Sequence, residues 1–274
     1  MPSIAEKRAT FRALHESGCF VLPNPWDVGT ALYLQHAGFK ALASTSAGFA
    51  FSRGLADNAV PRDAVLGHLS ELVAATDLPI NADFENGFAH EPAAVAENVR
   101  LCAATGVAGL SVEDSTGNAS SPLYPIDAAA ERIRAARKAL DATAPDTMLV
   151  ARAECYLVGR PDLAETLARL RAYADAGADC LYAPGITTRA EISAAVEAVA
   201  PRPVNVIVAK PIGLSVADLA DMGVRRISIG SAMARAAWGA LIRSSTEIME
   251  HGSFEAFGGI TPSAELNALF RKAR

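Results

Sequence analysis

Polar residues that can hold a cation or move a proton recur toward the carboxyl ends of short apolar runs and directly after them. In chain order they are Asn24, Asp27, Ser44, Thr45, Ser46, Asp83, Glu85, Glu113, Asp114, Arg152, Glu154, Tyr182, Asn205, Ser228 and Ser231. Carboxylates brought together without a cation repel one another and raise their own pKa values. A divalent cation removes that repulsion, and oxygen ligands without His or Cys favour Mg²⁺ or Mn²⁺. The pattern therefore predicts a site for a hard cation.

Each feature taken alone also has a structural interpretation. Residues 81–87 fit a strand end and a turn in which an Asp caps the next helix. Residues 44–48 and 113–114 fit ordinary loops, and Arg152 can pair with Glu154. The functional interpretation depends on the coincidence of these features at the ends of several apolar runs.

Eight short apolar runs are the elements that would position these side chains. They cover residues 19–22, 41–44, 79–82, 109–112, 148–151, 179–182, 204–207 and 226–229. Near-continuous apolar character is typical of parallel strands that are buried on both faces. The Ala-rich segments between them, such as 127–141 and 162–176, carry apolar residues at helical spacing. Several of these segments end in Gly, as helices do when the chain turns left-handed.

Eight strand–helix units in 274 residues predict an α/β fold, a (β/α)₈ TIM-type barrel that forms a single domain over residues 1–274. A doubly wound sheet is the rival, but it usually has fewer strands, and no G-x-G-x-x-G follows the first run. In a barrel the active site lies at the carboxyl ends of the strands. The segment 232–274 is helical, interrupted at 252–259, and exceeds what barrel closure needs. We therefore expect it to serve contact between subunits.

Composition excludes several classes of protein. Hydrophobic residues make up 51 % of the chain, which is enough for a large core. Thirty acidic residues against 25 Lys and Arg give no general attraction to nucleic acid or anionic membranes. Four Cys without a C-x-x-C pair indicate reduced thiols. The charged amino terminus and the absence of a long apolar stretch predict a cytoplasmic protein without a membrane partner.

Taken together and in order, several segments resemble the isocitrate lyase/phosphoenolpyruvate mutase family. They are Asn24-Pro25-Trp26-Asp27, Ser44-Thr45-Ser46-Ala47-Gly48, Gly54-Leu55-Ala56-Asp57, Asn81-Ala82-Asp83, Val112-Glu113-Asp114, Ala151-Arg152-Ala153-Glu154, Gly213-Leu214-Ser215 and residues 223–230. The likeness covers nearly the whole chain. It implies a barrel whose last helix is swapped between subunits of a homodimer or homotetramer, and Mg²⁺-dependent chemistry on 2-oxo acids or their enolates.

The resemblance also implies roles for individual residues. The metal group would be Asp83, Glu85, Glu113 and Asn81, with Asp83 closest to Mg²⁺ (or Mn²⁺) and the others holding metal-bound water. The substrate group would be Trp26, Ser44, Thr45, Ser46, Ala47, Gly48, Asn118, Arg152 and Asn205. The catalytic group would be Asp57, on a mobile segment, Arg152 and Glu113. A 2-oxo acid can chelate Mg²⁺, which stabilises the enolate formed when a carbon–carbon bond breaks.

The sequence departs from the family pattern at three places. Asn81 stands where the family's Asp-x-Asp metal motif has its first Asp. The loop 115–122 lacks the Lys, Cys and His of isocitrate and methylisocitrate lyases, and it keeps only Asn118 of the Lys and Asn of phosphonate-forming mutases. The acidic residue after the sixth strand is absent, with 183–184 reading Ala-Pro. These differences disfavour isocitrate cleavage and phosphoryl transfer.

The sequence thus predicts a Mg²⁺-dependent carbon–carbon lyase or decarboxylase that acts on a small 2-oxo or 2-hydroxy dicarboxylic acid through an enolate. Decarboxylation of oxaloacetate and cleavage of a substituted malate are the leading cases. A phosphonomutase or C–P hydrolase is one alternative. A barrel that binds a dicarboxylate without turning it over is another.

Overall fold

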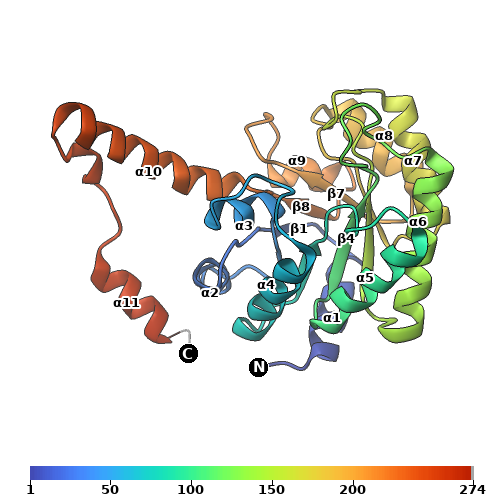
Figure 1. Ribbon diagram of the computed structural model, residues 1–274, viewed down its shortest axis with the longest axis horizontal. Coiled ribbons are helices and arrows are strands. Elements are labelled where there is room, and N and C mark those ends of the chain that lie inside the picture. Colours follow the sequence, from blue (N-terminus) through green and yellow to red (C-terminus); the bar gives the residue numbers. More distant parts are fainter. Residues whose placement is uncertain (273–274) are drawn as a thin grey trace.

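The computed structural model describes residues 1–272, and its strands form the predicted barrel (Figure 1). The strands are β1 (Phe20–Leu22), β2 (Leu42–Ala43), β3 (Ile80–Asp83), β4 (Gly109–Glu113), β5 (Met148–Arg152), β6 (Cys180–Tyr182), β7 (Val204–Ile207) and β8 (Arg226–Ser228). All seven paired neighbours are parallel, in the order β1-β8-β7-β6-β5-β4-β3-β2. The remaining gap between β1 and β2 is bridged where Ala43 N donates to Pro23 O at 3.0 Å. The (β/α)₈ prediction is therefore confirmed.

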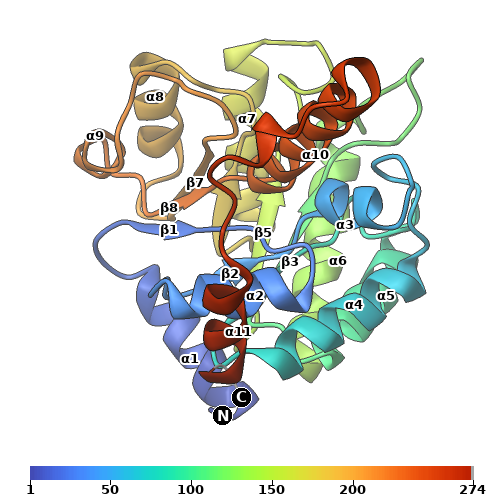
Figure 2. The same ribbon diagram turned by 90° about the vertical axis from the view of Figure 1, so that its left-hand side faces the viewer.

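Helices pack around the outside of the strands (Figure 2). They are α1 (Ile4–Leu14), α2 (Val28–His36), α3 (Ser46–Ser52), α4 (Arg62–Ala75), α5 (Pro92–Ala104), α6 (Ile126–Thr143), α7 (Leu163–Asp175), α8 (Arg189–Val199) and α9 (Val216–Asp221). The segments predicted at 127–141 and 162–176 are α6 and α7. Gly177 ends α7 with φ of +101°, the left-handed conformation predicted for such positions.

Apolar side chains close the amino end of the barrel. Phe11 of α1 is fully buried and lies against the start of β4, beside Met148 at the start of β5. The ring of His15 meets the rings of Phe11 and Phe20 edge-on, with centroids 4.7 and 5.0 Å apart. The amino end is therefore filled, and the interior opens at the carboxyl ends of the strands, where the predicted polar residues lie.

The chain continues past β8 as α10 (Ala232–His251), a short 3₁₀ helix η1 (Glu255–Phe257) and α11 (Ser263–Lys272). Figure 1 shows α10 extending away from the barrel, and α11 returns to contact α2 (Figure 2). The predicted helices and their interruption are confirmed, while residues 273–274 of the predicted segment lie outside the described range. Of α10, only Ala234 is buried. Across residues 1–272, none of the helices combines the length and apolar character needed to cross a membrane.

Gly109 provides a test of the packing inside the barrel. A Cβ at this position would lie 2.7 Å from Phe11 Cε1 and 2.8 Å from Asn81 Oδ1. We expect Gly109→Ala to lower the free energy of unfolding by about 1–3 kcal/mol through overpacking, as measured by urea denaturation. The control is Gly67→Ala in α4, where a Cβ meets open space. That change should raise stability by up to about 1 kcal/mol, and equal effects of the two substitutions would contradict the packing.

Candidate active site

A cavity of about 190 Å³ opens at the carboxyl end of the barrel. Every strand, or the segment that follows it, contributes to its wall. The lining residues are Asn24, Ala43, Ser44, Thr45, Ser46, Ala47, Asp57, Asn81, Asp83, Ser111, Arg152, Leu157, Tyr182, Ile207, Arg226, Ser228, Gly230 and Ser231. A space of this size suits an acid of a few carbon atoms. Its position is the one that active sites take in barrels of this kind.

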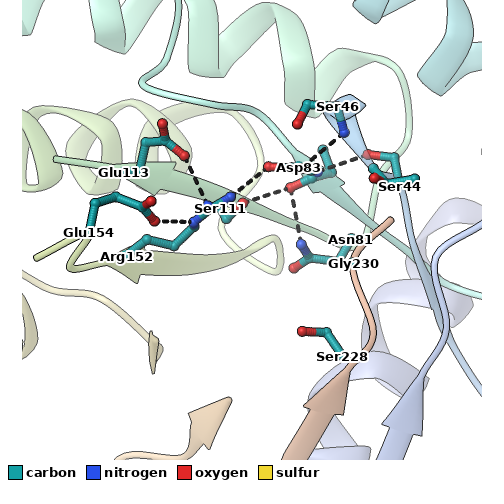
Figure 3. A network of polar contacts seen from close by, with 12 residues as sticks. Ser44, Ser46, Asn81, Asp83, Ser111, Glu113, Arg152, Glu154, Ser228 and Gly230 are labelled. Carbon is teal, nitrogen blue, oxygen red and sulfur yellow. Dashed lines mark hydrogen bonds and ion pairs between the residues drawn. The ribbon is translucent and has the colours of Figure 1, made fainter. Parts of the chain in front are cut away.

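One guanidinium organises the acidic side chains at the strand ends (Figure 3). Arg152 Nη1 lies 2.8 Å from Asp83 Oδ1, and Nη2 lies 3.2 Å from Glu113 Oε2. Its Nε donates to Glu154 Oε1 at 2.9 Å. All four side chains are largely buried, so the charges interact with little screening by solvent. Three carboxylates thus share one fixed cation.

The ends of β2 and β3 are joined through Asp83. The backbone N–H of Ser46 donates to Asp83 Oδ2 at 3.0 Å, and Asp83 N donates to Ser44 Oγ at 2.8 Å. Thr45 caps α3, since its Oγ1 accepts from Gly48 N at 3.2 Å. A Cβ on Gly48 would lie only 2.6 Å from Thr45 Cγ2, so this position needs glycine. The segment predicted to bind substrate is therefore held rigidly against Asp83.

Burial, and to a smaller extent neighbouring charge, raises the pKa of three acidic groups. Burial raises the pKa of Glu113 well above its usual value, although Arg152 opposes the shift. Burial likewise raises the pKa of Glu154, again against Arg152. Burial, with the charges of Asp83 and Asp57 adding to it, raises the pKa of Glu85 to about 8. Glu85 also has a φ of +47°, a strained backbone conformation for a residue with a side chain.

The residues fit a magnesium ion held mainly by Asp83. Within residues 1–272, no three His, Cys, Asp or Glu side chains converge closely enough to enclose a metal. Mg²⁺, however, commonly uses one or two carboxylates and completes its octahedron with water and ligand oxygens. Asp83 faces the cavity, and each of its oxygens accepts one bond and keeps further lone pairs. Glu85 and Glu113 do not line the cavity.

Several other predicted site residues lie outside the cavity. Trp26 lines a separate apolar groove with Trp238 and Leu241 of α10. Asn118 lines a surface hollow beside His90. Gly48 is buried against the side chains of Thr45 and Trp26. By contrast, the cavity wall brings together eight of the predicted site residues: Ser44, Thr45, Ser46, Ala47, Asp57, Asn81, Asp83 and Arg152.

Three polar residues at the strand ends serve the scaffold. Asn24 Oδ1 accepts from the backbone N–H groups of Ile229 and Gly230, which ties the end of β1 to that of β8. Asn205, predicted to bind substrate, is fully buried and donates to Ser228 Oγ at 3.0 Å. Asp114 accepts from Arg169 Nη1 at 3.0 Å in the barrel wall. These contacts stabilise the shape of the cavity.

Two polar residues of the cavity wall were not predicted as site residues from the sequence. Arg226 and Ser111 both lie within predicted strands and not after them. A charged residue inside a strand that is otherwise apolar was the signal available for Arg226.

The comparison with known proteins agrees with this architecture. The phosphoenolpyruvate phosphomutase family model matches residues 11–249. A Burkholderia cenocepacia J2315 protein, provisionally described as a lyase or mutase, has a crystal structure that superposes on this chain with a TM-score of 0.95. The two sequences are 51 % identical, and the match covers 98 % of this chain and 97 % of that one. An uncharacterized Mycobacterium tuberculosis protein is 35 % identical over 81 % of this chain and 82 % of its own. An oxaloacetate decarboxylase of Bradyrhizobium is 31 % identical over 71 % of this chain and 67 % of its own.

The chain therefore belongs to the phosphoenolpyruvate mutase family, within the phosphoenolpyruvate mutase/isocitrate lyase superfamily. Members of this superfamily are enzymes and include both lyases and mutases.

Removing Arg152 should expose the repulsion between the acidic groups. We expect Arg152→Gln to lower the free energy of unfolding by about 3–5 kcal/mol at pH 7.5, because buried carboxylates lose their cation. In the variant the folded state holds protons that the unfolded chain has lost, so stability falls as pH rises. The deficit should therefore be smaller at pH 5.5 in urea denaturation.

The matched control is Arg160→Gln, which removes an exposed arginine 3.3 Å from Glu165. Surface pairs of this kind contribute less than about 1 kcal/mol. A deficit for Arg152→Gln that matches the control, or that grows at low pH, would contradict the charge balance described above.

Proposed function

We propose that this protein is a Mg²⁺-dependent carbon–carbon lyase or decarboxylase that acts on a small 2-oxo or 2-hydroxy dicarboxylic acid, with Mn²⁺ as a possible substitute. The observation that carries the proposal is the small cavity in which Asp83 and Arg152 face the same space. Decarboxylation of oxaloacetate is the leading reaction, and cleavage of a substituted malate is the second. The 31 % identity to an oxaloacetate decarboxylase supports this order.

The chain's own residues have distinct tasks in this proposal. Asp83 would hold the ion, which when bound supplies a Lewis acid that polarises the keto group. Arg152 attracts the substrate carboxylate and is itself oriented by Glu113 and Glu154. Asp57 stands at the exposed mouth of the cavity, where a carboxylate can exchange a proton with the product. The carbanion left after loss of carbon dioxide can also take its proton from water.

The loop after β4 favours a lyase over chemistry at phosphorus. A phosphonomutase or C–P hydrolase needs side chains around the phosphoryl group that moves. Asn118, which the resemblance offers for that task, lies in the surface hollow beside His90 and away from the cavity. Loss of carbon dioxide makes no such demand on the loop.

The activity test is direct. We expect the protein with Mg²⁺ to release pyruvate from oxaloacetate faster than Mg²⁺ alone, followed by a coupled lactate dehydrogenase assay. Chelation of the metal or Asp83→Asn should lower kcat/KM by about 100-fold or more, since the ligand and its charge are lost. Asp77→Asn, at an exposed Asp outside the barrel mouth, should leave the rate unchanged.

Two results would replace the proposal. Conversion of phosphonopyruvate, seen by phosphorus NMR without pyruvate release from any diacid, would assign chemistry at phosphorus. Melting shifts with diacids but no product from any of them would assign a binding protein. Activity that survives both chelation and Asp83→Asn would contradict the proposed dependence of the reaction on a metal ion.

We further propose that the chain, as one domain over 1–274, forms a homodimer or homotetramer in which segment 232–274 is swapped between subunits. Exposed apolar side chains along α10 support this, among them Trp238, Leu241 and Ile242, which are 41, 56 and 58 % exposed. A face of this kind on a lone chain favours association. A cytoplasmic location, with no nucleic-acid or membrane partner, belongs to the same proposal.

The assembly is tested by light scattering after gel filtration. We expect the wild type to run as a dimer or tetramer and the double substitution Leu241→Glu/Ile242→Glu to shift it to a smaller species, because charges would be buried at the contact. Val216→Glu, at a residue of α9 that is 48 % exposed, is the control and should not change the mass. A monomeric wild type would contradict the proposed assembly.

A further inference from the structure

A buried arginine without a carboxylate partner lies at the floor of the cavity. Arg226 opens β8, is only 2 % exposed and forms part of the cavity wall. Its Nε donates to Asn205 Oδ1 at 2.8 Å, and its Nη1 lies 3.3 Å from Asn81 Oδ1. Within residues 1–272 it makes no ion pair. Its positive charge is therefore left uncompensated inside the barrel.

Other buried arginines of this chain are satisfied in ways that Arg226 is not. Arg152 and Arg169 pair with carboxylates. Arg132, also 2 % exposed, donates to the backbone carbonyls of Ala89, His90 and Asn86 and lies over the ring of Tyr124. Arg226 instead has two amide oxygens and an open space in front of it. A buried charge is unfavourable unless it is paired, so this cation is suited to an anion that enters from the cavity.

Asn81 explains how the charge of Arg226 is kept free. An Asp at this position would form an ion pair with Arg226 and cancel its charge. The amide instead accepts from the guanidinium and donates its own N–H to Ala82 O at 3.0 Å. The departure from the Asp-x-Asp pattern thus coincides with a cation that is available for a ligand.

We propose that Arg226 binds the deeper carboxylate of a small dicarboxylate and sets the preference of this cavity for dicarboxylates over monocarboxylates. The second carboxylate then lies nearer the mouth, beside Arg152. Arg226 supplies the uncompensated charge, and the guanidinium of Arg152, although paired with Asp83 and Glu113, has further N–H donors for the second carboxylate. The choice of a dicarboxylate as occupant rests on the proposed function, while the anion site itself stands on the contacts of Arg226.

Calorimetric titration with malonate and acetate, in buffer stripped of divalent cations, tests this inference without catalysis. The wild type should bind malonate more tightly than acetate. Arg226→Gln should weaken malonate binding by about tenfold or more, because a charged hydrogen-bond donor is lost, and should reduce the preference over acetate. Arg225→Gln is the matched control, since the side chain of this half-buried neighbour donates to Gly18 O at 3.0 Å and does not line the cavity. It should bind malonate as the wild type does.

Thermal melting of the ligand-free proteins separates a binding role from a structural one. Arg226→Gln removes an uncompensated charge and should keep or raise the Tm. Asn81→Asp should also raise the Tm, through a new ion pair with Arg226, and should weaken malonate binding. A carboxylate at position 81 that forms no ion pair with Arg226 would be an unpaired buried charge and would lower the Tm instead. Asn81→Asp also keeps the test decisive if Arg226→Gln does not fold.

The inference is overturned if the wild type binds no malonate, if Arg226→Gln binds it within about twofold of the wild type, or if either variant melts lower than the wild type. These results are distinct from failure of the proposed function. Malonate binding that depends on Arg226 without turnover of any diacid would support the anion site and reject the lyase. Turnover of oxaloacetate by the wild type, together with unchanged malonate binding by Arg226→Gln, would support the lyase and reject the anion site at Arg226.

Discussion

The sharing of one guanidinium by three carboxylates is the interaction on which the rest of the site depends. Arg152, the last residue of β5, lies within hydrogen-bonding distance of three carboxylates. Asp83 ends β3, Glu113 ends β4, and Glu154 follows β5. One positive charge cannot balance three negative ones in a buried space. Burial of the carboxyl group, together with the charges of Asp83 and Asp57, therefore raises the pKa of Glu85 to about 8.

The barrel interior is organised in layers, and their order gives the cavity its direction. Phe11 and its apolar neighbours seal the amino end. Above them lies a layer of Arg226 with Asn81 and Asn205, held by amide contacts alone. The acidic network around Arg152 follows at the carboxyl end. A ligand that enters from solvent thus meets carboxylates and a first cation at the mouth and a second cation at the floor.

Membership in the phosphoenolpyruvate mutase family fixes the scaffold more firmly than the reaction. The barrel and the acidic strand ends are compatible with cleavage of a carbon–carbon bond and with chemistry at phosphorus. The reason is that both reactions require negative charge that develops on a small acid to be stabilised. Loops decide between such reactions. In this chain the loop after β4 leaves Asn118 outside the cavity. At the floor of the cavity, Asn81 stands in place of the family's Asp and leaves the charge of Arg226 without a carboxylate partner.

The sequence by itself determined the strands, the long helices and the acidic positions at the strand ends, because apolar periodicity and Gly at helix ends are local signals. Asp83 and Arg152 were predicted from their place after such strands and do meet in one cavity. The directions of side chains were decided only by the tertiary structure: Glu85, Trp26 and Asn118 lie outside the cavity, and Arg226 lies within it. Strands of two to five residues, apolar on both faces, carry too little alternation to show which side chains point inward. Closure of the barrel sets that direction through contacts between residues far apart in the chain.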